Sequence, residues 1–137
     1  MKLIVLDTNV IISARLSPGG APATLVMEYV LTGRVQLATC PSVIQEYLEV
    51  AHRSKFARFQ FPPPWLEELI EESLQSSDPE PWPLALPDRA DAVFLALAHA
   101  SGAWLVTGNL KHFPKSARCG VTVISPAEYL GDLEKER

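Results

Sequence analysis

Cysteine is scarce in this sequence, which has only Cys40 and Cys119 among its 137 residues. The two lie far apart, and neither has a second cysteine close to it along the chain. Zinc sites and disulfide-rich scaffolds use closely spaced cysteines, so the sequence argues against both. Isolated cysteines suit a reducing compartment, and we predict a cytoplasmic location.

Long apolar runs are missing as well. The N-terminal run at residues 3–6 ends at once in Asp7, and it is too short for a signal peptide or a membrane span. No internal repeat or low-complexity tract is present. A chain of 137 residues with 47% apolar content can bury a core without a disulfide or a metal. We therefore expect one domain over residues 1–137, without membrane association.

Positive charge is in deficit, because 12 Lys and Arg face 16 Asp and Glu, for a net charge of −4. Six of the acids fall within residues 67–80, whereas residues 53–58 and 111–118 contain none. These two acid-free stretches carry Arg53, Lys55, Lys111 and Lys115. One interpretation is ordinary solvated surface. The other is a pair of basic flanks that would suit a phosphodiester substrate.

Strand and helix patterns alternate along the chain. Short runs rich in β-branched residues predict strands at 3–6, 35–38, 104–107 and 121–124. Helical spacing of apolar residues predicts helices at 21–32, 41–51, 65–75, 89–101 and 126–130, and Pro41 stands where the first residue of a helix tolerates proline. Residues 76–87 hold four prolines and predict a loop. This alternation indicates an α/β fold, a three-layer α/β/α sandwich around a parallel sheet of four to five strands.

Acidic residues occur where strands end and helices begin. Asp7 directly follows the first predicted strand, and Asp88 and Asp91 open the most apolar helix. Each has a simpler interpretation, because Asp is a good helix N-cap and complements the helix dipole. Glu46 borders the apolar stripe of its helix, where it could also be a boundary residue that reaches solvent.

Thr107 and Asn109 follow a later strand around Gly108, a sequence that is also typical of a turn. The carboxyl ends of parallel strands meet at one edge of the sheet, where ligands bind in such folds. We therefore expect Asp7, Glu46, Asp88 and Asp91 to converge there. Carboxylates suit a hard cation, Mg²⁺ or Mn²⁺.

The ordered motifs resemble those of the PIN-domain family, and more narrowly its VapC-like toxin branch. The motifs are LDTNV at 6–10, VIQEYL at 43–48, DRAD at 88–91 and TGNLKHFP at 107–114, and the likeness extends from residue 2 to about residue 130. The resemblance implies a Mg²⁺- or Mn²⁺-dependent ribonuclease, usually a homodimer, that is often neutralised by a small antitoxin.

The resemblance also assigns residues. Asp7, Glu46 and Asp91 match the acidic core of the family, and Asp88 matches an extra acid present in some members. Asn109 stands where many members have Asp, so a second metal would bind more weakly. Asn9, Thr107 and Asn109 would support the site.

The predicted reaction is hydrolysis of RNA by a metal-activated water, with Arg53, Lys55, Lys111 and Lys115 steering the RNA backbone. Two alternatives stay open. A haloacid-dehalogenase-like phosphatase would use Asp7 as nucleophile, but that class usually has a second Asp where this chain has Asn9. A degenerate domain would bind RNA or a protein partner without catalysis.

Overall fold

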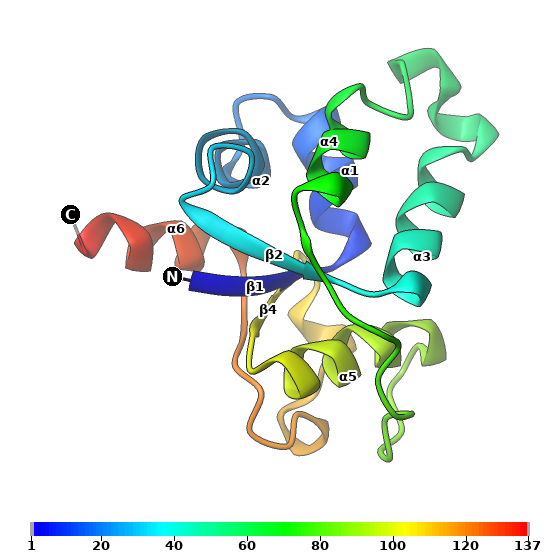
Figure 1. The fold of residues 1–137 in the computed structure, drawn as a ribbon, viewed down its shortest axis with the longest axis vertical. Coiled ribbons are helices and arrows are strands. Elements are labelled where there is room, and N and C mark those ends of the chain that lie inside the picture. The colour runs from blue at the N-terminus through cyan, green and yellow to red at the C-terminus, as the bar shows by residue number, and fades with distance from the viewer. Residues whose placement is uncertain (1, 137) are drawn as a thin grey trace.

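The computed structural model describes residues 2–136, which form a five-stranded parallel sheet with helices on both faces (Figure 1). The strand order is β3-β2-β1-β4-β5, so β1 (Lys2–Leu6) lies at the centre between β2 (Val35–Thr39) and β4 (Trp104–Val106). The edge strands are β3 (Leu74–Gln75) and β5 (Val123–Ile124). Every strand pair is parallel, which confirms the predicted sheet.

Within residues 2–136, six α-helices surround the sheet: α1 (Thr8–Leu16), α2 (Ala21–Thr24), α3 (Pro41–Ala51), α4 (Trp65–Glu71), α5 (Ala92–Ser101) and α6 (Pro126–Lys135). In Figure 1, α1, α2 and α4 lie on one side of the sheet and α5 on the other. The helix α3 contacts both α1 and α5. This arrangement is the predicted three-layer α/β/α sandwich.

The centre of the core is formed by β1, α3 and α5. Ile4, Val5 and Leu6 are all at most 1% exposed, as expected for a strand covered on both faces. Phe94 on α5 stacks on Tyr47 of α3, with ring centroids 6.5 Å apart. The apolar content of α5 is explained by this central position, because a helix that is apolar nearly all round is buried.

Two predicted helices differ from the structure. The helix expected at 65–75 ends at Glu71, and Leu74–Gln75 instead forms β3, which pairs with the outer edge of β2. The side chain of Gln36 on β2 donates to the Glu72 carbonyl (2.9 Å) and draws this segment alongside. The helix expected at 21–32 is α2 followed by a π-helix at Leu25–Val30, because the Leu31 amide donates to the Val26 carbonyl five residues back.

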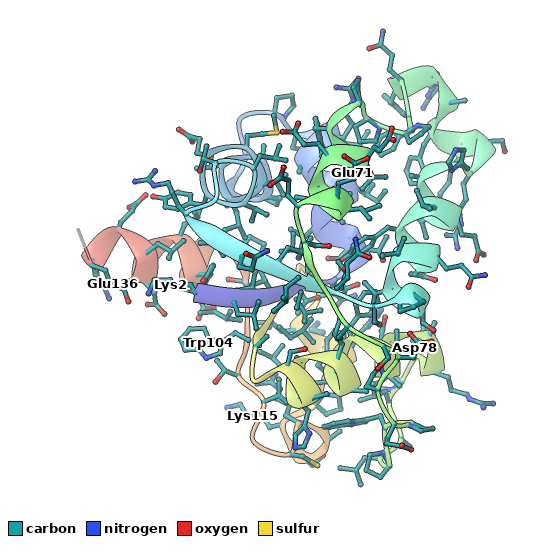
Figure 2. The ribbon with its side chains drawn as sticks, in the orientation of Figure 1. Lys2, Glu71, Asp78, Trp104, Lys115 and Glu136 are labelled. Carbon is teal, nitrogen blue, oxygen red and sulfur yellow. The ribbon has the colours of Figure 1, made fainter. Side chains whose placement is uncertain are left out.

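In the C-terminal third, element boundaries differ from the prediction, and the 3₁₀ turns at Leu110–His112 and Lys115–Ala117 were not predicted. The strand predicted at 121–124 is limited to Val123–Ile124, and the terminal helix extends to Lys135 rather than 130. Lys2 and Glu136 form an ion pair that ties this helix end to the start of β1 (Figure 2). Within residues 2–136, the helices are too short or too polar to cross a bilayer.

The proline-rich segment at 76–87 contains no helix or strand, as predicted, but it is tied down at two points. Asp78 accepts hydrogen bonds from the Ser42 amide (2.9 Å) and hydroxyl (2.6 Å) at the start of α3. Trp82 Nε1 donates to the Ala117 carbonyl (2.9 Å). Asp78 therefore caps α3 from a distance, a role that Cys40 at the N-cap position does not fill.

Candidate acidic site at the carboxyl edge of the sheet

Asp7 lies at the end of the central strand and is 5% exposed. Its amide donates to the Val106 carbonyl on β4 (3.0 Å), and its Oδ2 accepts from the Thr107 hydroxyl (2.8 Å). It occupies the N-cap position of α1, yet its side chain makes no capping hydrogen bond. Burial raises the pKa of Asp7, and the Thr107 hydroxyl offsets part of that rise. The amides of Thr8 and Asn9 also lower the pKa of Asp7, but burial remains the largest influence on this carboxylate.

The turn after β4 supports Asp7 through a short hydrogen-bond network. Besides donating to Asp7, the Thr107 hydroxyl accepts from the Asn109 amide (3.0 Å). The Gly108 amide donates to Asn9 Oδ1 (3.1 Å), and a Cβ at Gly108 would lie only 3.4 Å from that oxygen. The structure thus brings Asn9, Thr107 and Asn109 together around Asp7. In this network Asn109 takes part through its backbone amide.

Asp91 is the second buried acid, 8% exposed, and directly precedes α5. Its Oδ2 is buried and receives no well-formed hydrogen bond, although His112 Nδ1 lies 2.9 Å away, within ion-pair distance. Burial, followed by the charges of Asp7 and Asp88, raises the pKa of Asp91 to about 6. A cation bound beside Asp91 would stabilise its ionised form and so lower this pKa.

Asp88 and Glu46 flank the buried pair. Asp88 is exposed, and its Oδ1 accepts from the Ala90 amide (3.0 Å), so it does cap the 3₁₀ turn at Arg89–Asp91. Glu46 is half-buried on α3. Burial and the neighbouring Glu49 raise the pKa of Glu46, and Asp7 and Asp88 add to this rise. The four carboxylates therefore share one electrostatic environment.

The four acids do not form a closed cage. Within residues 2–136, no three acidic, histidine or cysteine side chains are close enough to one another to hold an ion by themselves. Mg²⁺ does not require such a cage, because it is usually held by one or two carboxylates, with waters and substrate phosphates as further ligands. The buried Oδ2 of Asp91, which has only the His112 ring close to it and lies near a second buried carboxylate, fits a cation of this kind.

Two residues near the site were not assigned a role from the sequence. Tyr47 is fully buried, and its hydroxyl donates to the Leu6 carbonyl (2.6 Å), so α3 is fastened to the residue before Asp7. His112 lies beside Asp91 because the 3₁₀ turn at Leu110–His112 follows the Thr107 network. His112 belongs to the TGNLKHFP motif and Tyr47 to the VIQEYL motif, so both motifs were usable signals.

The four predicted RNA-steering residues differ in how close they lie to the acidic site. Arg53 follows α3 and lies close enough to Glu46 to counter the rise in the pKa of that carboxyl. Lys111 is exposed next to His112, and Lys55 and Lys115 are exposed on separate 3₁₀ turns. Only Arg53 and Lys111 are therefore adjacent to residues of the site, and the RNA contacts of all four stay a prediction.

The raised pKa of Asp91 predicts how stability without metal depends on pH. The folded state holds this proton more tightly than the unfolded state, so stability falls as pH rises from about 4 to 6 and stays reduced above that range. With a pKa moved from 3.8 to about 6, the loss is on the order of 3 kcal/mol. In EDTA, we expect Asp91→Asn to exceed wild type in urea stability at pH 7.5 and to match it near pH 4. A difference that does not vary with pH would contradict this assignment.

Comparison with known proteins adds a family match and several similar folds. The family model described as PIN domain matches residues 3–111. A chain from the crystal structure of VapBC2 from Rickettsia felis, bound to a promoter DNA fragment, is 17% identical with a TM-score of 0.61, covering 90% of this chain and 98% of that one. A chain of DNA-bound VapBC from Salmonella typhimurium is 16% identical, with a TM-score of 0.61 and coverages of 92% and 99%.

A chain of FitAcB from Neisseria gonorrhoeae is 20% identical, with a TM-score of 0.55 and coverages of 90% and 98%. The TM-scores show a shared fold over nearly the whole chain, and at identities this low they show nothing more than the fold. No curated protein gives a significant match to the sequence.

Proposed function

The chain belongs to the PIN-domain family, and on that premise we propose that it is a Mg²⁺- or Mn²⁺-dependent endoribonuclease, the toxin of a type II toxin–antitoxin pair. The observation that carries the proposal is the pair of buried acids, Asp7 and Asp91, at the carboxyl edge of the sheet. Their burial and mutual repulsion would be costly in a purely structural role. Membership of this family leaves no support for the phosphatase alternative.

Asp7 and Asp91 would hold the cation, with Glu46 and Asp88 at its margin. The bound ion would lower the pKa of the attacking water and offset the charge that develops on the phosphate. Thr107 holds one oxygen of Asp7 in place, so this carboxylate is pre-oriented before substrate arrives. No side chain of the chain has to act as a covalent nucleophile.

The remaining polar residues would position the substrate. Arg53 and Lys111 adjoin residues of the site, Lys55 and Lys115 lie on separate 3₁₀ turns, and all four would neutralise RNA phosphates. The similar folds come from structures named VapBC and FitAcB, and by analogy we propose that this chain binds a small antitoxin and forms a homodimer.

The direct test is cleavage of single-stranded and total RNA with Mn²⁺ or Mg²⁺, and with EDTA. We expect cleavage only with the metal, and mapping of the new 5′ ends would define the cleaved sequence. Intact RNA under all of these conditions would contradict the proposed activity.

Metal binding can be measured separately from cleavage. A ligand present at a hundred times its Kd stabilises the native state by about 2.7 kcal/mol. For a chain of 137 residues, Mn²⁺ should therefore raise the melting temperature by roughly 5–10 °C. The Asp7→Asn variant should show a much smaller rise, and a full-sized rise in that variant would place the ion elsewhere.

A non-catalytic domain that binds RNA or a protein partner is the second candidate function. Asn109 in place of an acid favours it, as does the net charge of −4. This candidate predicts RNA binding in EDTA with no metal-dependent cleavage, and no Mn²⁺-induced rise in melting temperature.

A further inference from the structure

The 3₁₀ helix at Ser54–Phe59, which follows α3, contributes nothing to the core. None of its six residues is buried, although two of them are phenylalanines, and Phe59 is 41% exposed. Figure 1 shows this segment projecting from the body of the molecule beyond the end of α3. The ring of Phe59 on this projecting segment is therefore accessible to a ligand.

Cationic side chains are paired with both aromatic rings of the segment. The guanidinium of Arg58 lies over the Phe59 ring, 4.8 Å from its centroid, and the Lys55 ammonium lies 5.1 Å from the centroid of Phe56. Phe56 also packs against Phe61, with centroids 5.0 Å apart. The Phe59 ring and the Arg58 guanidinium thus form a flat stacked pair at the surface, while Phe56 anchors the segment by packing against Phe61.

The segment is fastened to α1 by Arg15. This side chain donates to the Phe59 carbonyl (3.4 Å) and to the Gln60 side chain (3.1 Å). Gln60 adopts a left-handed conformation with φ of 60°, which ends the 3₁₀ helix and which the Arg15 contacts hold in place. The ring of Phe59 is therefore presented by a backbone that is ordered before any ligand arrives, which lowers the entropic cost of binding.

Charge along residues 51–66 is opposite in sign to that of the whole protein. Residues 51–66 contain no acid and three cations, and Arg15 adds a fourth, against a net charge of −4 overall. We name Arg15, Arg53, Lys55, Arg58 and Phe59 the basic–aromatic surface. Aromatic rings set among cations are the common platform for single-stranded nucleic acid, because every base has a stacking face.

The surface is connected to the acidic site by two helices. The helix α1 begins directly after Asp7 and carries Arg15 in its last turn, so about 12 Å of helix axis separates Asp7 from Arg15. Glu46 lies on α3, and Arg53 follows that helix. A strand with its scissile phosphate at the acids would reach the surface within a few nucleotides.

We propose that the basic–aromatic surface binds the single-stranded RNA substrate beside the acidic site, with a base stacked on Phe59 and Arg58 and phosphates neutralised by Arg15, Arg53 and Lys55. The identity of the ligand rests on the proposed function. The surface itself rests on exposure, cation–aromatic geometry and local charge.

The test is the fluorescence anisotropy of a labelled single-stranded RNA of mixed sequence, in EDTA so that nothing is cleaved. Loss of one base–aromatic stack should make Phe59→Ala bind about 5- to 150-fold more weakly. Phe59→Tyr should bind like wild type because it keeps the ring. Leu84→Ala is the matched control, since Leu84 is 40% exposed on the distant proline-rich segment, and it should bind like wild type.

Equal binding of the single-stranded RNA by Phe59→Ala and wild type would overturn the inference. So would an equal loss of affinity for a duplex RNA, whose bases are already stacked on one another. A third contrary result would be that Phe59→Ala weakens binding to vesicles containing phosphatidylserine but leaves RNA binding unchanged. Failure of the proposed activity would look different. If RNA binding depended on Phe59 but Mn²⁺ produced no cleavage, the proposed ribonuclease activity would be excluded and the proposed RNA-binding surface would stand. If Phe59→Ala bound and cleaved RNA at wild-type levels, the ribonuclease would be kept and the basic–aromatic surface would be removed.

Discussion

Replacing Asp7 by Asn should lower Mn²⁺-dependent RNA cleavage by at least about a hundredfold. Loss of a residue that only supports a metal ligand already costs about 10- to 100-fold in affinity or activity, so loss of a ligand should cost more. The fold should survive, because the amide keeps the shape of the carboxylate and its oxygen can still accept from Thr107. Cleavage rates at saturating RNA and melting temperature in EDTA would be measured together.

Asp132→Asn provides the matched control for this change. Asp132 lies on α6, outside the carboxyl-edge network, and its substitution removes the same charge from the protein. Its cleavage rate should equal that of wild type within about twofold, since surface changes of this kind are close to neutral. Equal cleavage by Asp7→Asn and Asp132→Asn would refute the assignment of Asp7.

Truncating Phe94 to Ala should destabilise the protein by about 3–5 kcal/mol, the usual cost of removing a buried aromatic side chain. Phe94 is 1% exposed, and it stacks on Tyr47, whose hydroxyl holds the Leu6 carbonyl next to Asp7. For a domain of this size, the loss corresponds to a fall in melting temperature of roughly 10–20 °C. Calorimetry in EDTA would measure it.

Phe59→Ala makes the same chemical change at an exposed position, and it should cost less than about 1 kcal/mol. Comparing Phe94→Ala with Phe59→Ala therefore separates the stability that comes from burial from any effect of losing an aromatic ring in itself. If both variants lost similar stability, the packing of α5 against α3 would not be the dominant contribution at Phe94.

Local patterns were enough to predict the elements that position the acids. The run Leu3–Leu6 is apolar without interruption, which occurs when a strand is covered on both faces, and the structure places it at the centre of the sheet. Pro41 at the first position of a helix and the apolar sequence after Asp91 were similarly reliable. These signals act within one turn or one strand, so they do not depend on the rest of the chain.

The errors share a different physical origin. Leu74–Gln75 becomes a strand only because β2 offers it an unpaired edge, and that partner lies more than thirty residues earlier. The capping of α3 by Asp78 across the proline-rich segment depends on a contact of similar separation. Neither contact has a local signature, because hydrogen bonds between distant segments are decided by the assembled fold.

The acidic site was predicted unevenly for the same reason. The burial of Asp7 and Asp91 follows from the apolar elements that they adjoin, and both are buried. Asp88 does cap its turn, so the simpler interpretation describes its backbone contact. The approach of His112 to Asp91 required the whole turn after β4 to be in place, and no spacing rule predicts it. The metal and catalytic roles of these residues stay predictions.

Both borders of the sheet are very short, since β3 and β5 have two residues each. A long open border offers a row of unpaired amides and carbonyls to which another chain can add as an extra strand, which is the usual route to fibrillar aggregation. Here that template is almost absent at either border. Self-assembly of this protein, or recruitment of a small regulator, should therefore proceed through helix faces and not by extension of the β-ladder.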